Sequence, residues 1–594
     1  MFASNFSLRL ATVLFVLSGL LLAQSRGGGG HSTAPSGPTT SVAYGVPNNP
    51  LPSAVPVLSA NDEGKIEFRT QSILVQVPVV VTSKSGDHIR GLKKENFHLF
   101  ENGKEQKVST FEEIVSTNAK FPAVATKPGE FSNLALSDEQ PRTVTVIALD
   151  TVNTPFLDQY TGRRELVKYL ASSLDSGNVL ALMIITSHGL KIVQGLSGDS
   201  THLMQLLKKD GGELPALQGV DMDTQAAATQ DISVFSPVVS GSDPDAAMNA
   251  FLQHGDALIA QFQQQNAIET TLNAFLGIAW SLSGVPGRKS LIWATGGFPF
   301  SISTPSAVPG GYLSTLYERT MEALTAAQIS VYPVDVRGLV NISSVDARQS
   351  RALSGSGRSQ QITSRSWLQQ NTLDTLNEFA DMTGGKAFYN TNDLASSFKR
   401  AADDASSYYL AGYYLDIHNN HAGWRQLKVK VDKPDIEVRA RKGFFVTNAT
   451  IHAELTRNSD LSYALTSPIE GTGVPLTVKW LGNSGDGAKK SAQFFIHLPA
   501  NSVSIEASEG QSHVNFDYVA AAFANDSKTG QPYTSAAKTF AVAVSEGQMA
   551  KLRADGIGFN NSLELGPGKY TVRVVIRDNV NGKVGSVTAP ITVN

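Results

Sequence analysis

Two short clusters in the chain carry metal-ligand side chains at close spacing. His418 and His421 lie three positions apart in the polar segment 416–423, and paired imidazoles can bind a transition metal. An Asn-rich segment between two predicted strands is also typical of a plain turn. Asp221 and Asp223 resemble the start of a calcium-binding loop, but the Gly at its sixth position and the Glu at its twelfth are absent. For both clusters, a plain turn or loop is therefore a better interpretation than a metal site.

The motifs that mark common enzyme active sites are absent from the sequence. It contains no G-x-S-x-G elbow, no H-E-x-x-H, no phosphate-binding G-x-x-x-x-G-K and no dinucleotide fingerprint. Cysteine is absent too, which excludes disulfides, thiol chemistry and thiolate zinc sites. A formal net charge of -3 without a basic block gives no reason to expect a nucleic-acid partner. We expect no enzymatic activity, with a hydrolase whose site lies unrecognised in the insertions as the alternative.

The first 25 residues have the pattern of a secretory signal peptide. Arg9 precedes an apolar run from Leu10 to Ala23, which Gln24 and Ser25 follow. The run is shorter than the roughly 20 residues of a membrane-spanning helix. An uncleaved anchor is the alternative, because the cleavage site lacks a small-x-small pattern. We therefore expect export to the periplasm, the cell surface or the medium, without a transmembrane anchor.

Composition and periodicity divide the rest of the chain into segments. At 594 residues the chain is too long for a single core. Residues 26–65 are rich in Gly, Ser and Pro and predict a flexible leader. Residues 66–116 predict a small N-terminal β module, and residues 447–594 predict a β-sandwich of immunoglobulin-like size. Residues 411–446 predict a β extension of the region before them.

Residues 140–410 alternate strands with helices. A strand is predicted over 143–149 and an amphipathic helix over 160–174. Short apolar strands separated by helices favour a largely parallel sheet covered on both faces, as in a doubly wound, Rossmann-like α/β domain. Two long polar stretches, 211–265 and 340–371, interrupt this rhythm. We expect both to be insertions on the rim of the sheet.

Several motifs of this region resemble the von Willebrand factor type A (VWA) fold, and in particular the bacterial VWFA-related Acidobacterial domain family. The motifs that carry the resemblance are the segments Gly91–Phe97, Asp150–Pro155, Gly287–Leu291, Val334–Gly338 and Arg439–Phe445. They extend the resemblance over roughly residues 66–446, whereas the sandwich at 447–594 rests on periodicity alone. The resemblance implies a VWA-like central domain flanked by all-β, immunoglobulin-like modules.

The resemblance also implies a metal site at the carboxyl end of the sheet. In that fold an Asp-x-Ser-x-Ser loop, a Thr from a second loop and an Asp from a third bind Mg²⁺. Asp150 and Thr154 match the first and last positions of the first loop, but Val152 replaces its middle Ser and Gly296 replaces the third-loop Asp. This implies a degenerate site, with Asp150, Thr154 and Asn153 as candidate ligands for Mg²⁺ or another divalent cation. The other interpretation is that Asp150 caps the following helix or bonds its own loop, and then no cofactor is expected.

Ligands of doubly wound sheets bind beyond the carboxyl ends of the strands, where the connecting loops diverge. At that rim we expect the partner-binding residues Ser197, Asp199, Thr201, Thr295, Gly296, Gly297 and Phe298. The two glycines allow close approach of backbone, and the phenylalanine could offer an apolar surface. The sequence thus predicts an exported binding or scaffold protein whose partner is another protein outside the cytoplasm. A purely structural envelope protein is a further alternative.

Overall fold

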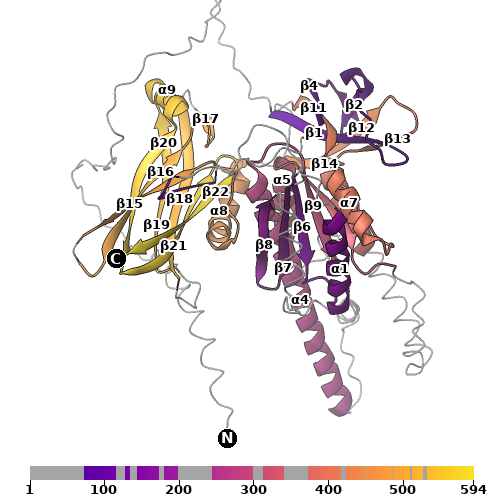
Figure 1. The fold of residues 1–594 in the computed structure, drawn as a ribbon, viewed down its shortest axis with the longest axis horizontal. Coiled ribbons are helices and arrows are strands. Elements are labelled where there is room, and N and C mark those ends of the chain that lie inside the picture. The colour runs from indigo at the N-terminus through magenta and orange to yellow at the C-terminus, as the bar shows by residue number, and fades with distance from the viewer. Residues whose placement is uncertain are drawn as a thin grey trace, which may run out of the picture. The chain divides into compact units, whose positions relative to one another are not determined.

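The computed structural model describes residues 73–115, 127–133, 144–172, 179–197, 244–298, 312–339, 372–415, 423–446, 449–485, 487–508, 511–525 and 532–594. The predicted signal peptide, the leader, His418, His421 and the 340–371 insertion lie outside these ranges. The described part is a mixed α/β structure that combines a helix-covered central sheet with all-β modules (Figure 1). Within it, no helix has the length and apolar character needed to cross a membrane.

A five-stranded sheet with the strand order β10-β9-β6-β7-β8 forms the central part. Its strands are β6 (Val144–Asp150), β7 (Val179–Thr186), β8 (Gly189–Ser197), β9 (Lys289–Thr295) and β10 (Ile329–Asp335). All are parallel except the edge strand β8, which runs antiparallel to β7. The four parallel strands are buried at every position, which explains their continuous apolar sequences.

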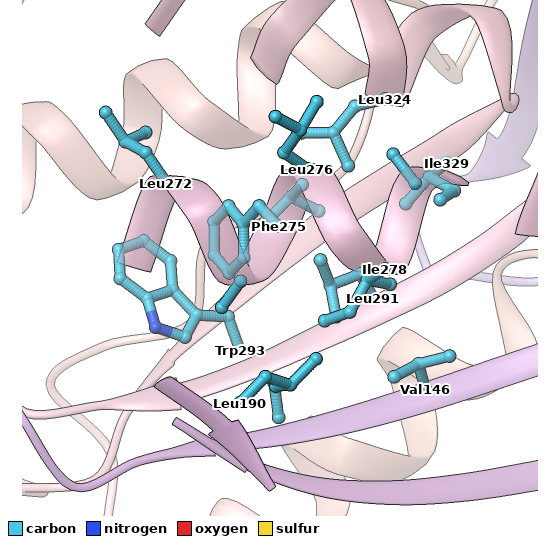
Figure 2. Packing of buried hydrophobic residues seen from close by; sticks show 14 of the residues in the cluster. Val146, Leu190, Leu272, Phe275, Leu276, Ile278, Leu291, Trp293, Leu324 and Ile329 are labelled. Carbon is cyan, nitrogen blue, oxygen red and sulfur yellow. The ribbon is translucent and has the colours of Figure 1, made fainter. Parts of the chain in front are cut away.

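Helices cover both faces of this sheet. They are α1 (Phe156–Ser172), α4 (Pro244–Leu282), α5 (Tyr312–Ala326), the helical residues 372–383, and α7 (Leu394–Asp403). α4, α5 and residues 372–383 share one core, in which Phe275 of α4 packs edge-on against Trp293 of β9, 5.1 Å between ring centroids (Figure 2). α1 and α7 share a second core on the opposite face, which includes Leu166 and Phe398. The sheet is therefore covered on both sides, as its sequence predicts.

The predicted insertion at 211–265 is only partly a loop. Residues 211–243 lie outside the described ranges, but residues 244–265 are the first part of the long helix α4. Ala, Gln and Leu dominate this stretch, and these residues favour helix even where no apolar stripe marks it. In Figure 1 the first half of α4 extends past the ends of the strands. The prediction of a loop at 244–265 was wrong.

A β module is assembled from two distant parts of the chain. Its elements are β1 (Ile73–Ser83), η1 (Lys94–Asn96), β2 (Phe97–Glu101), β3 (Lys104–Gln106), β4 (Thr110–Val115), β11 (Ser407–Leu415), β12 (Gly423–Val431), β13 (Ile436–Arg439) and β14 (Gly443–Val446). They form two four-stranded sheets, with the orders β13-β1-β11-β4 and β14-β12-β2-β3. Val77, Leu99 and Tyr413 lie in their common core.

This assembly differs from the predicted division into a module at 66–116 and an extension at 411–446. Strands of the first stretch pair directly with strands of the second, for example Val77 with Ala411 and Leu99 with Val429. Alternation within a strand reports which face is buried but not which strand is its neighbour. The two stretches are therefore one module, into which the central sheet is inserted.

The C-terminal part contains two sheets, β20-β16-β15-β5 and β17-β18-β21-β22, with β19 paired to β18. The elements are β5 (Glu130–Ser132), α8 (Ala449–Thr466), β15 (Thr477–Ser484), β16 (Lys490–Leu498), β17 (Ile505–Ser508), β18 (Gln511–Ala524), β19 (Thr534–Val544), α9 (Glu546–Asp555), β20 (Ile557–Leu565), β21 (Gly568–Asp578) and β22 (Val584–Val593). Both sheets contribute to one core, which includes Phe494 and Val574. Helix α8 begins this region, where only strands were expected, and β5 joins it from ahead of the central sheet.

Candidate functional site

The carboxyl end of β6 holds a buried acid whose two oxygens are both bonded within the protein. Asp150 is 2% exposed, and its Oδ1 accepts hydrogen bonds from the backbone N–H groups of Val152 and Asn153, each at 3.0 Å. Its Oδ2 accepts from Asn153 Nδ2 at 2.8 Å and from Trp293 Nε1 at 2.9 Å. Thr295 Oγ1 lies 3.2 Å from the same oxygen. We call these five residues, with Thr154 and Thr271, the Asp150 centre.

The pKa of Asp150 depends on its burial and on its hydrogen-bond donors. Burial raises the pKa of its carboxyl group, and the hydrogen bonds from Asn153, Trp293 and Thr295 oppose that effect without cancelling it. A carboxylate in this position depends on its donors, because water does not reach it to replace them. The group is therefore held as an acceptor that organises the surrounding loops.

Asn153 connects the loop after β6 with helix α4. Its Nδ2 contacts both Asp150 Oδ2 at 2.8 Å and Thr271 Oγ1 at 2.9 Å. Thr271 lies within the long helix α4, so a hydroxyl group from a second element meets the loop after β6. Asn153 Oδ1 is buried and has no hydrogen bond among the described residues. An amide NH₂ group thus stands between the carboxylate of Asp150 and the hydroxyl of Thr271.

Thr154 and Gly296 bring the loops after β6 and β9 into close contact. Gly296 N donates a 2.8 Å hydrogen bond to Thr154 Oγ1, which is buried. A Cβ atom at position 296 would lie 2.8 Å from Pro155 Cδ and 3.1 Å from Asn153 O. A side chain at position 296 therefore requires the loop to move, which is the close backbone approach that the glycine predicted.

These residues do not fit a divalent cation bound as the resemblance implies. Mg²⁺ and Ca²⁺ take about six or more oxygen ligands. Both oxygens of Asp150 are already bonded to donors, and Val152 offers no side-chain oxygen. The Gly296 position has no room for the missing aspartate. The three candidate ligands Asp150, Asn153 and Thr154 do lie together. Donors of the protein bond Asp150 and Thr154, whereas Asn153 Oδ1 accepts no hydrogen bond among the described residues.

A second charged group, the ion pair of Asp335 with Arg337, lies at the end of β10 and was not predicted from the sequence. Arg337 Nε donates to Asp335 Oδ1 at 2.8 Å, and a second guanidinium nitrogen donates to Oδ2 at 2.7 Å. Burial raises the pKa of Asp158 in the first turn of α1, with the Arg337 charge opposing and the Asp335 charge reinforcing that effect. Asp335 ends its strand as Asp150 ends β6, and this shared position is the signal that could have revealed it.

The residues predicted to line the rim are not all brought together. Thr295 ends β9 at the carboxyl edge, Gly296, Gly297 and Phe298 follow it, and all four are buried. Phe298 is 1% exposed and packs edge-on against Trp293 at 5.3 Å between ring centroids. It therefore belongs to the core and offers no apolar surface to a partner.

Ser197 lies at the opposite edge of the sheet. It pairs with Leu180, the second residue of β7, because β8 runs antiparallel to its neighbour. The carboxyl end of an antiparallel strand meets the amino ends of the parallel ones. Asp199 and Thr201 follow Ser197 in the sequence and lie outside the described residues. The placement of Ser197 with Asp150 on one rim was wrong.

Other residues carry exposed apolar surface near the carboxyl edge. Phe156 and Tyr160 begin helix α1 and are 58% and 62% exposed, and Leu339, four residues after β10, is 64% exposed. The backbone N–H of Leu339 donates to Asn392 Oδ1 at 3.0 Å, which fixes this segment. We call Phe156, Tyr160 and Leu339 the apolar rim residues. They were not predicted from the sequence, since the exposure of a side chain at a helix start or in a loop depends on how these elements lie on the sheet.

No family model matches the chain, and no curated protein matches it. Among solved structures, an aerotolerance-related membrane protein from Bacteroides fragilis NCTC 9343 is similar at 12% identity and a TM-score of 0.22, over 44% of this chain and 98% of that one. A mutant of the PilB minor pilin from Streptococcus sanguinis is similar at 10% identity and 0.23, over 45% and 61%. The SpaC pilus adhesin from Lactobacillus rhamnosus GG, in its open conformation, is similar at 9% identity and 0.25, over 86% and 59%. TM-scores this low do not establish a shared fold or function.

Proposed function

We propose that this chain is an exported, non-enzymatic protein that binds another protein through the carboxyl edge of a VWA-like domain. The strand order β10-β9-β6-β7-β8, with an antiparallel edge strand and helices on both faces, supports that fold. So do the motifs that resemble the VWFA-related family, of which Asp150–Pro155 lies at that edge. Loops there diverge to opposite faces and can form a binding surface.

One observation carries the proposal. The carboxylate of Asp150 and the hydroxyl of Thr154 accept hydrogen bonds within the protein, while the apolar rim residues Phe156, Tyr160 and Leu339 are exposed. Single exposed apolar residues are common on protein surfaces, but aromatic residues are enriched where proteins bind one another. The binding that this edge supports is therefore apolar contact, without a metal-bridged carboxylate of the partner.

The alternative function is that of a hydrolase, and one contact between a serine and a histidine is relevant to it. Ser187 Oγ lies 3.2 Å from His188 Nδ1 in the hairpin between β7 and β8. The two residues are adjacent and exposed, and no carboxylate of the described residues bonds the other nitrogen of His188. A nucleophile is normally activated by a base that a third group orients. This pair lacks that third group, so it supports catalysis poorly.

The test compares two triple variants of the exported protein. Phe156, Tyr160 and Leu339 are replaced by serine in the rim variant, and the exposed Leu481, Tyr533 and Val542 of the C-terminal part are replaced by serine in the control. Affinity capture from envelope extracts is followed by mass spectrometry. We expect the control to retain the partner that the wild type captures and the rim variant to lose it. Equal capture by all three proteins would refute binding through this edge.

A further inference from the structure

Strand β19 forms an open edge of the C-terminal part. It pairs along its whole length with β18, from Thr534 opposite Ala522 to Val544 opposite Ser512, and no other strand of the described residues pairs with it. Each of its eleven residues is exposed or half-buried, and Lys538 is the single charged one. Natural edge strands are usually short, or are blocked by charges or by proline. This edge is long and carries one charge and no proline, so its free backbone groups can accept a further strand.

The hydrogen bonds of β18 show which residues of β19 carry the free groups. Odd-numbered residues of β18 bond towards β21, because Asn525 N donates to Lys569 O at 3.1 Å and Asn579 N donates to Asn515 O at 3.0 Å. Successive residues of a strand direct their backbone groups to opposite sides, so the even-numbered residues of β18 bond to the even-numbered residues of β19. The free N–H and C=O groups therefore belong to the odd-numbered residues of β19, which are Ser535, Ala537, Thr539, Ala541 and Ala543.

The even-numbered side chains of β19 lie on the face of the sheet that covers the sandwich core. Phe540, for example, stacks on the buried Phe516 of β18 at 4.7 Å between ring centroids. Val542 lies on the same face opposite the buried Val514, yet it is 53% exposed. The described strands of the sandwich therefore leave the core incompletely covered at this edge, and an added strand would cover more of it.

We propose that β19 pairs with β19 of a second copy of this chain, antiparallel and with the two-fold axis at Thr539. This register brings odd-numbered residues of one strand opposite odd-numbered residues of the other, so the free backbone groups of both strands bond each other over their full length. A two-fold interface requires one surface that is complementary to itself. The proposal concerns the C-terminal part alone, so it does not depend on the rim being a protein-binding surface.

The side chains of β19 meet this requirement of self-complementarity. Val542 comes opposite Ala536 of the other copy, and Val544 comes opposite Thr534, so each bulkier residue meets a smaller one. Lys538 comes opposite Phe540 of the other copy, and in its own chain its Nζ already lies 4.8 Å from the centroid of the Phe540 ring. On the opposite face every odd-numbered residue is small. This symmetry of the sequence about Thr539 favours a second copy over an unrelated strand.

Sedimentation equilibrium of the full chain over a range of concentrations tests the proposal with two charge variants. Positions 537 and 541 are exposed, and in the proposed dimer each lies directly opposite the other position of the second copy. The variant A537K/A541K places like charges opposite each other, and A537K/A541E places opposite charges there. We expect the wild type to dimerise, and A537K/A541K to raise the dissociation constant at least about fivefold. A537K/A541E should stay within about twofold of the wild type or bind more tightly.

A wild type that remains monomeric up to its solubility limit would overturn the proposal, as would equal dissociation constants for the two charge variants. Amide hydrogen exchange covers a further outcome. Slow exchange at Ala537 and Ala541 in a monomeric sample would mean that another segment of the same chain pairs with the edge, and it would overturn the proposal too. Circular dichroism confirms that each variant is folded.

Cysteine cross-linking tests the register, and the chain has no cysteine of its own to interfere. In Thr539→Cys the two thiols meet at the axis, where paired Cα atoms are about 5.5 Å apart and a disulfide can form. In the control Ala537→Cys the two thiols are four residues out of register, about 14 Å apart, which is too far. Thr539→Cys also removes the hydroxyl that donates to Asp517 Oδ1 at 2.8 Å, so its urea unfolding is compared with that of the wild type.

We expect mild oxidation to give a covalent dimer of Thr539→Cys and to leave Ala537→Cys monomeric on a non-reducing gel. Addition of the A537K/A541K changes to Thr539→Cys should slow the cross-linking at least about fivefold. A covalent dimer of Ala537→Cys at the same rate, or a folded Thr539→Cys that forms none, would overturn the proposed pairing.

Discussion

The indole Nε1 of Trp293 donates a 2.9 Å hydrogen bond to Oδ2 of Asp150, within the interior between strands β9 and β6. A buried indole N–H requires an acceptor, and a buried carboxylate requires donors. Asp150 therefore supplies the acceptor for the indole, and Trp293 supplies a donor for the carboxylate. This pair makes the Asp150 centre part of the core of the sheet as well as part of its edge.

Asp150→Ala should destabilise the protein strongly. The change leaves the Trp293 indole without its acceptor and removes one of the two acceptors of the Asn153 side-chain amide. Loss of such a buried partner costs about 2–5 kcal/mol of unfolding free energy. Urea unfolding followed by tryptophan fluorescence gives the value. Asp403→Ala on α7 is the control, and because that carboxyl is exposed it should change the stability by less than about 0.5 kcal/mol. A loss below about 1 kcal/mol for Asp150→Ala would show that the centre is not a structural network.

Divalent cations should have little effect on thermal stability. Donors of the protein occupy both oxygens of Asp150, and Gly296 has no room for a further ligand, so millimolar Mg²⁺, Ca²⁺ or Mn²⁺ should shift the melting temperature by less than about a degree. Differential scanning fluorimetry with and without EDTA measures the shift. A rise of several degrees that Asp150→Ala abolishes would restore the metal interpretation.

Lys289 should make stability depend on pH. Its side chain is fully buried and donates to Val285 O at 2.5 Å, and burial lowers its pKa to about 7. The pKa of an unfolded lysine is about 10.4, so the folded protein is destabilised fully below pH 7, and that effect fades as the pH rises towards 10. The difference corresponds to about 5 kcal/mol at most, since one pKa unit equals about 1.4 kcal/mol.

The variant Lys289→Met removes this dependence. At pH 6.5 it should be more stable than the wild type by about 2–5 kcal/mol, and the difference should shrink steadily up to pH 10. Urea unfolding of both proteins at each pH gives the difference directly, so that other titrating groups cancel. A constant difference between pH 6.5 and 10 would contradict a neutral, buried lysine.

Shortening residues 211–265 should leave the fold intact and weaken partner binding. In α4 the first buried residues of the described part are Ala267 and Ile268, whereas Ile259 and Phe262 are exposed on the projecting half of the helix. Removal of the projecting half therefore takes away little of the core. Circular dichroism and a pull-down decide the matter: loss of folding would make the segment structural, and unchanged binding would place the interface elsewhere.

The amino-terminal segment should be removed on export. The apolar run from Leu10 to Ala23 predicts a mature protein that begins at or shortly after Gln24. Edman sequencing of protein recovered outside the cytoplasm gives the first residue. Retention of Met1 on most molecules would mean that the segment is an anchor or is not a signal at all.

The central sheet was the part of the fold that its sequence revealed best. Continuous apolar runs such as Val144–Leu149 and Val331–Val334 are typical of strands covered on both faces, and they are buried throughout. Pairings such as Ile73 with Leu415 leave no trace in either strand, because register and partner are decided by tertiary packing. Ser197 was misplaced for a related reason, since apolar patterning does not give the direction of a strand.

Of the candidate site, only the residues in the loop after β6 could be predicted from the sequence. Asp150, Asn153 and Thr154 are close in sequence, so one turn after a strand necessarily brings them together. Trp293 and Thr271 come from the interior of a strand and of a helix, where their types are equally typical of core packing. That their polar atoms meet Asp150 depends on the distance between α4, β9 and β6, which no local pattern encodes.

Strand β5 has a consequence for how this chain can be divided. Its residues Glu130–Ser132 pair with β15, and the side chain of the adjacent Asn133 bonds Gly471 O at 2.6 Å and Leu476 N at 2.8 Å. A fragment that starts after residue 446 would lack this strand and expose one side of β15 as an open sheet edge. The remaining fragment would carry an orphan strand. Neither fragment is a complete domain. Recombination or cloning with a cut after residue 446 would therefore yield two incomplete products that are prone to aggregate.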